Sequence, residues 1–179
     1  SFYMLDGEKK IIEDAIKGEA SAFGLLYDKY QPQIYRFIYL KVGHREEAED
    51  LTHQVFLSAL QNIEKYQHKG FPFSSWLYQI SRNKIIDHWR TRKITLDIED
   101  AAEQGENDLE IEKIGIRFEI ERVQKAIPQL KDEYQDVIIM RFIEELSYEE
   151  IATALNKPQT TVRVLQHRAI KQLKDILEK

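Results

Sequence analysis

The chain has 179 residues, 42% of them hydrophobic, which is enough apolar material for one or two small cores and argues against disorder. It has no cysteine, which excludes disulfides and thiolate zinc sites, and no apolar run approaches the roughly 20 residues of a membrane span. A formal net charge of −5 argues against a protein that coats nucleic acid indiscriminately, and the absence of a signal segment predicts a cytoplasmic protein with no membrane insertion of its own.

Charge is distributed unevenly along the chain. Residues 82–93 are strongly basic, whereas residues 94–112 carry no Lys or Arg and many Asp and Glu. The chain becomes basic again toward its C-terminal end. We interpret the acidic stretch as a linker, with an N-terminal domain at 1–93, the linker at 94–116 and a C-terminal domain at 117–179. A plain solvated loop is the alternative reading of this stretch.

Apolar side chains spaced three and four residues apart predict three helices in the first third of the chain. They span about 11–16, 21–41 and 45–63. Pro32 must kink or interrupt the second of these, because proline cannot donate its backbone hydrogen bond. In the third helix, the stripe facing the core is expected to consist of Leu51, Val55, Ala59 and Ile63, widened by Phe56 and Leu60.

A break at Lys69–Phe73 precedes a fourth predicted helix that runs toward Trp89. We expect Ser74 or Ser75 to cap its first turn. No segment alternates apolar and polar residues for long enough to indicate a strand. The predicted fold class is therefore all-α.

The most informative pattern lies near the C-terminal end, after two further helices predicted at about 118–127 and 131–142. Ser147 and Glu150 form a capping box that opens a short helix, and Asn156–Pro158 is a turn before a longer helix from about Gln159. Two helices joined by a short turn, the second basic on its outer face, indicate a helix-turn-helix. The alternative is an αα-hairpin that only packs.

The second helix of this motif is a candidate reader of duplex DNA. Arginine can hold guanine through two hydrogen bonds in the major groove, and lysine more often holds phosphate. Plain solvation is the alternative for any single side chain. The candidate residues are Thr160, Thr161, Arg163, Val164, His167, Arg168 and Lys171.

A second candidate site lies in and after the Lys69–Phe73 break, where aromatic and basic residues alternate. Aromatic faces beside cations suit the unstacked bases of single-stranded DNA, and an amide can read the edge of a flipped base. The alternative is that some of these side chains, Trp76 above all, are core. The residues are Phe71, Phe73, Trp76, Arg82, Asn83, Lys84, Arg90 and Arg92.

Together these segments resemble the extracytoplasmic-function (ECF) group of bacterial RNA polymerase sigma factors over nearly the whole chain. The matching segments are Ala22–Tyr30, Ala48–Leu57, Phe73–Asn83 with Asp87 and Arg90, Leu146–Ala152, and Thr161–Ala169. Three places depart from the family pattern: His53-Gln54, Val164-Leu165-Gln166 and Leu130-Lys131. The first affects docking on polymerase and the second removes an expected cation from the reader helix.

The resemblance implies a role for each segment. The third helix, through Glu49, Asp50, Leu51, His53, Gln54 and Phe56, would dock on the clamp helices of core RNA polymerase. The Lys69–Ser74 loop with Asn83 would capture a flipped base of the −10 element, with Asp87 in the same segment. The C-terminal domain would lie on the polymerase flap and read the −35 duplex, and the linker would thread toward the active-site cleft. An anti-sigma factor is a possible further partner.

Two other functions compete with this interpretation. A stand-alone helix-turn-helix regulator would explain residues 147–179 but leaves the aromatic and basic segment without a role. An enzyme would need a catalytic constellation, and the five histidines are scattered without a carboxylate partner at metal-binding spacing. We therefore predict no catalytic residues, no metal site and no cofactor.

Overall fold

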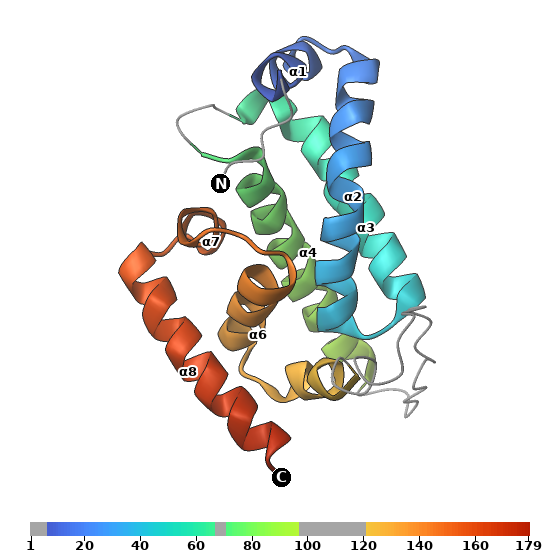
Figure 1. Ribbon diagram of the computed structural model, residues 1–179. Helices are drawn as coiled ribbons and strands as arrows, with labels where there is room; N and C mark the ends of the chain where they lie inside the picture. Colours follow the sequence, from blue (N-terminus) through green and yellow to red (C-terminus); the bar gives the residue numbers. More distant parts are fainter. Residues whose placement is uncertain (1–6, 67–70, 97–120) are drawn as a thin grey trace.

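The computed structural model describes residues 7–66, 71–96 and 121–179, except for the side chains of 93–96. Every regular element in these ranges is helical (Figure 1), so the all-α prediction is confirmed. Most of the predicted acidic linker lies outside the described residues, as do Lys69 and Gly70 of the predicted break. None of the described helices combines the length and apolarity needed to cross a membrane.

Among its described residues, the N-terminal domain has four α-helices and one short 3₁₀ turn. They are α1 (Glu8–Ile16), α2 (Ala20–Val42), α3 (Arg45–Asn62), η1 (Ile63–Lys65) and α4 (Phe73–Leu96). The expected interruption at Pro32 is absent, because α2 continues through this residue. Pro32 is exposed, so water can reach the carbonyl that lacks a donor, while Tyr30, Ile34 and Phe37 anchor the helix in the core on both sides.

The start of α4 differs from the prediction. The helix begins at Phe73, and neither Ser74 nor Ser75 is its cap. Both serine side chains are buried and donate hydrogen bonds to Glu150 instead, Ser74 to the carboxylate at 3.3 Å and Ser75 to the backbone oxygen at 2.8 Å. Their hydroxyls therefore join the two domains rather than cap the first turn of α4.

The C-terminal domain begins, within the described residues, with a helix at 121–126. It continues through η2 (Ile127–Gln129), α6 (Asp132–Ile138), the π-helical turn η3 (Ile139–Ile143), α7 (Tyr148–Leu155) and α8 (Gln159–Leu177). The predicted capping box is confirmed, with Ser147 and Glu150 bonding each other's backbone N–H groups. Asn156 takes a left-handed conformation at φ 53° and ends α7, and α8 starts three residues later, at Gln159.

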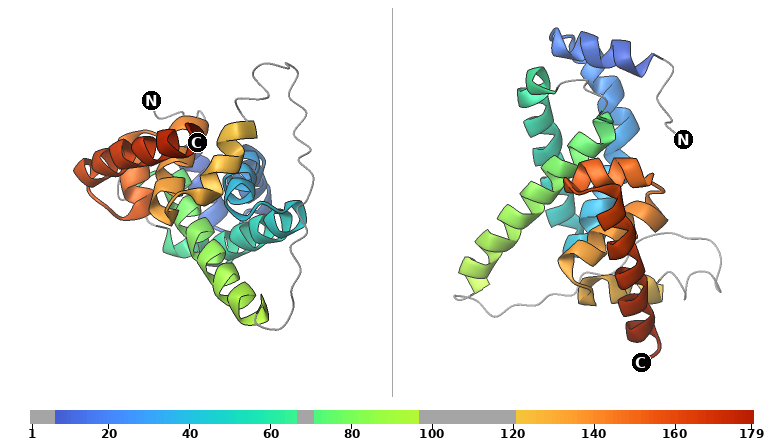
Figure 2. Two further views of the ribbon diagram at one scale, coloured as in Figure 1. Left: turned by 90° about the horizontal axis from the view of Figure 1, so that it is seen from below. Right: turned by 90° about the vertical axis from the view of Figure 1, so that its left-hand side faces the viewer.

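Helix α6 lies between α8 and the N-terminal domain (Figure 1), and α7 crosses over α4 in the right-hand view of Figure 2. One continuous apolar core passes from Ile34 and Phe37 through Tyr78 to Ile139 and Met140. Each such fully buried side chain stabilises the fold by about 1.5–3 kcal/mol. The two domains therefore share a core, and their facing surfaces are closed to solvent.

Candidate nucleic-acid interface

The outer face of α8 is open to solvent along its whole length, and the helix forms an edge of the molecule (Figure 1). Val162, Leu165 and Ala169 turn inward and hold the helix on α6 and α7. The predicted reader residues lie on the opposite side: Thr160, Arg163, Val164, His167, Arg168 and Lys171 are exposed and Thr161 is half-buried. An exposed, basic second helix of a helix-turn-helix is the form that can enter a major groove.

Two arginines of this domain enclose one tyrosine ring. The guanidinium carbons of Arg141 and Arg163 lie 4.4 Å and 4.3 Å from the ring centroid of Tyr148. Arg141 also donates to the backbone oxygen of Leu146 at 2.9 Å. Tyr148 thus fixes two cations at the beginning of the motif, and Arg163 is the one that the sequence predicts to contact DNA.

Replacing Tyr148 by alanine is expected to weaken binding to −35 duplex DNA by about twofold to thirtyfold, because a cation–π contact contributes about 0.5–2 kcal/mol. Tyr148→Phe keeps the ring and should bind like the unmodified chain. Fluorescence anisotropy with labelled duplex, in the presence of core polymerase, measures the affinities of both variants. If Tyr148→Phe is as weak as Tyr148→Ala, the ring does not position Arg163.

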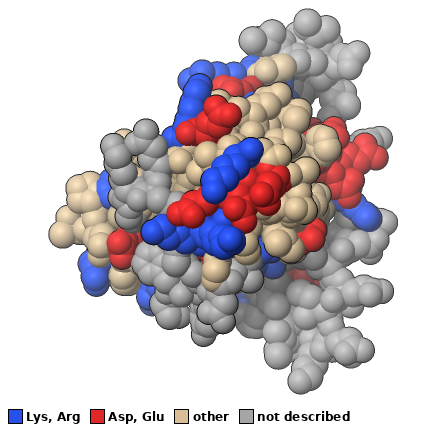
Figure 3. All heavy atoms as spheres, turned by 90° about the horizontal axis from the view of Figure 1, so that it is seen from above, with Lys and Arg blue, Asp and Glu red and all other residues tan. Residues whose placement is uncertain are grey.

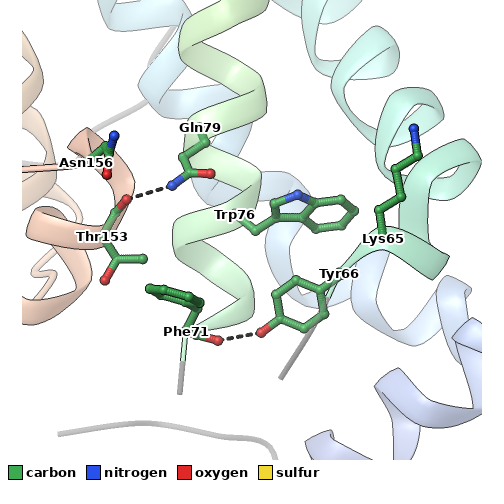
Figure 4. Close-up of a pocket in the computed structure, with 7 residues that line it drawn as sticks. All are labelled: Lys65, Tyr66, Phe71, Trp76, Gln79, Thr153 and Asn156. Atoms are coloured by element: carbon green, nitrogen blue, oxygen red, sulfur yellow. Dashed lines mark hydrogen bonds between the residues drawn. The ribbon is translucent and has the colours of Figure 1, made fainter. Parts of the chain in front are cut away.

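An aromatic pocket of about 310 Å³ lies at the start of α4 (Figure 4). The ring centroid of Trp76 is 5.2 Å from that of Tyr66 and 5.7 Å from that of Phe73. The Tyr66 hydroxyl donates to the backbone oxygen of Phe71, and burial raises the pKa of Tyr66 to about 12, so it remains a neutral donor. The lining residues are Lys65, Tyr66, Phe71, Trp76, Gln79, Thr153 and Asn156.

The amide in this pocket is that of Gln79, whereas Asn83 is not among the lining residues. Sequence reasoning missed Gln79, Tyr66 and Lys65. Gln79 could have been found, because it lies three residues after Trp76 and so shares its side of the helix. Thr153 and Asn156 could not, because they come from the other domain.

The structure divides the predicted −10 residues by exposure. Phe71, Asn83, Asp87 and Arg90 are exposed, and Trp76 and Lys84 are half-buried. Phe73 is 3% exposed and packs against Tyr30 and Tyr66 in the core, so its predicted contact with DNA is wrong. Its aromatic ring supports the pocket from behind.

Two of the predicted −10 cations already hold carboxylates of the same chain. Arg82 donates to Asp136 of α6 at 2.9 Å, and Arg92 donates to Glu47 of α3 at 3.3 Å. Asp136 is fully buried, whereas Glu47 is partly exposed. One donor group of each arginine is therefore held within the chain, and 22% of the Arg82 side chain and 32% of the Arg92 side chain stay exposed to solvent.

Helix α3 is the predicted polymerase-docking helix, but the side chains that it exposes are only partly the predicted ones. Glu49, Asp50, His53 and Gln54 are exposed. Leu51 and Phe56, however, are each only 4% exposed, because the helix turns them into the core, so neither side chain can contact a partner. Leu57 and Leu60 are 48% and 46% exposed on the face of His53 and Gln54, although Leu60 was predicted to face the core.

A partly buried polar network joins the two domains. Arg36 holds Glu144 through two hydrogen bonds of 2.6 Å and 2.7 Å, and Lys41 contacts Asp132 at 2.6 Å and also Asp136. Burial raises the pKa of Asp136, and the neighbouring cations lower it in part. Burial likewise raises the pKa of Glu144, and the neighbouring Arg36 lowers it in part.

The end of the molecule formed by α1 carries both acidic and basic side chains. Figure 3 shows acidic and basic side chains side by side there, and α1 and its flanks contribute Lys9, Lys10, Glu13, Lys17 and Glu19. A mixed surface does not attract a polyanion. Across the described ranges, no group of three or more acidic or histidine side chains is placed to hold a metal ion.

Comparison with known families matches both domains of the chain. Residues 26–94 match Sigma-70 region 2, and residues 120–173 match Sigma-70 region 4. The chain is 34% identical to the ECF RNA polymerase sigma factor SigW of Bacillus subtilis, over 94% of this chain and 97% of that protein. It is 33% identical to the ECF sigma factor BldN of Streptomyces coelicolor, over 94% of this chain but 65% of the length of BldN.

Solved structures share the fold. CnrH, in complex with the cytosolic domain of CnrY, has a TM-score of 0.74 at 20% identity, covering 96% of this chain and 97% of that one. RpoE of Bartonella quintana, in complex with the anti-sigma factor NepR, has a TM-score of 0.67 at 21% identity, covering 87% and 96%. With both region models and the full-length likeness to SigW, the chain belongs to the extracytoplasmic-function family of RNA polymerase sigma factors.

Proposed function

We propose that this chain binds core RNA polymerase in the cytoplasm and directs it to specific promoters, acting through binding contacts and without covalent chemistry. The observation that supports the proposal is that one chain holds two surfaces of different character, each suited to one form of DNA. The exposed face of α8 suits duplex DNA, and the aromatic pocket with the exposed face of α4 suits single-stranded DNA. Promoter recognition followed by strand opening needs both.

The −35 element would be read by α8. Arg163 is held at the N-terminal end of the helix by Tyr148, where side chains reach base edges, and Arg168 and Lys171 follow on the same side toward the phosphates. Thr160, Thr161, Val164 and His167 complete the surface. Replacing Arg163 by glutamine is expected to weaken −35 binding by about 1–3 kcal/mol and relax the preference at one base pair, measured on a panel of duplexes. Arg168→Gln is the comparison, because loss of a phosphate contact should weaken all duplexes alike.

The −10 element would be opened on α4. Trp76 and Phe71 offer aromatic faces for unstacked bases, Gln79 and Asn83 offer amides for base edges, and Arg90 offers a cation. Lys84, Asp87 and Arg92 flank this surface. Phe73 is left out as a contact residue because it is buried.

Core polymerase would dock on α3. The exposed side chains Leu57 and Leu60 supply apolar area, and His53 and Gln54 lie beside them, with Glu49 and Asp50 one turn earlier. We assign this face to the clamp helices and the C-terminal domain to the flap. Exposed leucines at the centre of a polar face are typical of protein interfaces.

The domain division that we propose places the N-terminal domain at 1–93, an acidic linker at 94–116 and the C-terminal domain at 117–179. The two matched regions, 26–94 and 120–173, support it. We also propose that an anti-sigma factor can bind this chain. RpoE of Bartonella quintana in complex with the anti-sigma factor NepR supports this by analogy of fold.

The test is run-off transcription with bacterial core polymerase on a promoter library, with and without this chain. Discrete transcripts that appear only when the chain is added would establish the function and reveal the −35 and −10 sequences together. Tight duplex binding without polymerase and without any new transcript would instead support a stand-alone helix-turn-helix regulator.

A further inference from the structure

The aromatic pocket at the start of α4 has the size and place of a small-ligand site. Its volume of about 310 Å³ lies at the lower end of the range of about 300–1,000 Å³ for such sites. Residues of both domains line it, and ligand pockets are common where two domains meet. Phe71 is 53% exposed, so the pocket can be reached from solvent.

The apolar surfaces of the pocket are aromatic rings. In the view of Figure 4, Gln79 lies above the space and Phe71 below it, with Thr153 on one side and Trp76 on the other. The Tyr66 hydroxyl holds the backbone oxygen of Phe71, and the centroid of the Tyr66 ring lies 5.2 Å from that of Trp76. Rings that are held in place in this way favour a flat, aromatic ligand.

The hydrogen bond of Gln79 determines which of its amide atoms a ligand meets. A backbone carbonyl oxygen can only accept, so the Gln79 Nε2 donates to the Thr153 oxygen at 2.7 Å. The amide oxygen is therefore turned the other way, toward the side of Trp76 (Figure 4). Because that oxygen is an acceptor only, it favours a flat ligand with an amino group and disfavours one with a carbonyl oxygen at the same place.

The charge of the pocket favours an anionic ligand. Among the seven described residues that line it, Lys65 is the only charged one, and its side chain is exposed. Burial raises the pKa of Tyr66 to about 12, so this hydroxyl remains neutral. Lys65 and Thr153 lie at opposite ends of the pocket (Figure 4). A ligand with its amino-bearing ring beside Gln79 can therefore extend an anionic group toward Lys65.

We propose that the free chain binds an adenine nucleotide in this pocket. The base stacks on Phe71 and Trp76, its N6 amino group donates to the Gln79 Oε1, and the phosphate lies toward Lys65. The inference goes beyond the proposed function, because it requires neither DNA nor polymerase. Since Phe71 and Trp76 are also the surfaces that we assign to unstacked DNA bases, a bound nucleotide competes with single-stranded DNA.

The first measurement compares two nucleotides on the free, full-length chain by isothermal titration calorimetry. Adenosine monophosphate is expected to bind with a dissociation constant below about 1 mM. Inosine monophosphate, which has a carbonyl oxygen in place of the N6 amino group, should bind about tenfold more weakly, because two acceptor oxygens would face each other. Equal affinities for the two nucleotides would overturn the proposal, as would the absence of saturable binding. This comparison needs no variant of the protein.

Three variants, each checked for folding by circular dichroism, assign the contacts. Gln79→Met should bind the adenosine and inosine nucleotides with equal affinity, and discrimination that persists in this variant would contradict the contact. Lys65→Met should bind adenosine monophosphate up to about fivefold more weakly but leave binding of adenosine, which has no phosphate, unchanged. The matched control is Lys10→Met, because Lys10 is exposed on α1 and does not line the pocket. An equal loss in Lys10→Met would remove Lys65 from the site.

Tryptophan fluorescence tests whether the nucleotide lies on Trp76. The chain has two tryptophans, so Trp89→Phe leaves Trp76 as the single emitter. Adenosine monophosphate should quench this emission with the dissociation constant found by calorimetry, since a stacked base quenches an indole. Heat of binding without quenching would place the nucleotide elsewhere and overturn the proposed site.

A last comparison distinguishes a free nucleotide from a nucleotide unit of a DNA strand. A short fluorescein-labelled oligodeoxyadenylate should bind the free chain, and adenosine monophosphate should displace it more effectively than inosine monophosphate does. Binding of the oligonucleotide alone, with no displacement by adenosine monophosphate, would remove the inference and leave the −10 assignment standing. Run-off transcription depends on the sigma role alone, so its failure would not remove a nucleotide site.

Discussion

Replacing Trp76 by alanine is expected to reduce open-complex formation by about tenfold to a hundredfold while leaving −35 duplex binding unchanged. A base stacked on an aromatic side chain contributes about 1–3 kcal/mol, and the half-buried ring of Trp76 lines the pocket. Asn83→Ala should also impair opening, because Asn83 is exposed on α4 and offers an amide to a base edge. Permanganate footprinting of the melted −10 region, with core polymerase present, measures the effect.

Trp76→Phe is the control for folding, because Trp76 also packs against Tyr66 and Phe73 in the domain core. The phenylalanine variant keeps an aromatic face and should retain most of the opening activity. Normal opening by both Trp76→Ala and Asn83→Ala would show that α4 does not capture the −10 strand, and the assignment of this surface would be wrong.

Replacing Lys41 by methionine is expected to lower the free energy of unfolding by about 3–5 kcal/mol. The Lys41 side chain is 2% exposed and holds Asp136, which is 0% exposed, so the substitution leaves a buried carboxylate with Arg82 as its remaining cation. Lys41 also lies over the ring of Trp89, 5.3 Å from its centroid. Urea denaturation followed by circular dichroism measures the loss.

Lys157→Met provides the matched control. Lys157 pairs with Glu133 at 3.9 Å across the surface, with 35% and 55% of the two side chains exposed, and such a pair contributes about 0–1 kcal/mol. The double variant Lys41→Met with Asp136→Leu should recover much of the lost stability, since apolar side chains can replace a buried ion pair. A loss below about 1 kcal/mol in Lys41→Met would mean that Asp136 is accessible to water.

The local features of this chain could be read from the sequence because they depend on neighbours within a few residues. The Ser147–Glu150 capping box, the turn at Asn156 and the start of α8 at Gln159 are each set by hydrogen bonds and backbone conformations over one turn of helix. The exposure of Arg163 and Arg168 follows from the spacing of Val162, Leu165 and Ala169 on the opposite side.

The predictions from the sequence were wrong where a residue could occupy either of two environments. Phe56 and Leu60 both fit the apolar stripe of α3, and only packing against α2 and α4 decides that Phe56 is buried and Leu60 exposed. Ser74 and Ser75 were expected to cap α4, but a cap competes with other acceptors, and Glu150 of the other domain provides one. Phe73 was predicted to face DNA and instead fills the core behind the pocket.

The sequence by itself determined the all-α class, the helix-turn-helix and its exposed reader face, since periodicity and capping act within single helices. It also carried the family likeness, through motifs that are contiguous in the chain. Only the tertiary structure decided that Arg82 holds Asp136, 54 residues away, and that Thr153 and Asn156 line the pocket beside Trp76. These contacts join residues whose separation in the sequence carries no signal, because burial and charge pairing between domains depend on how whole helices pack.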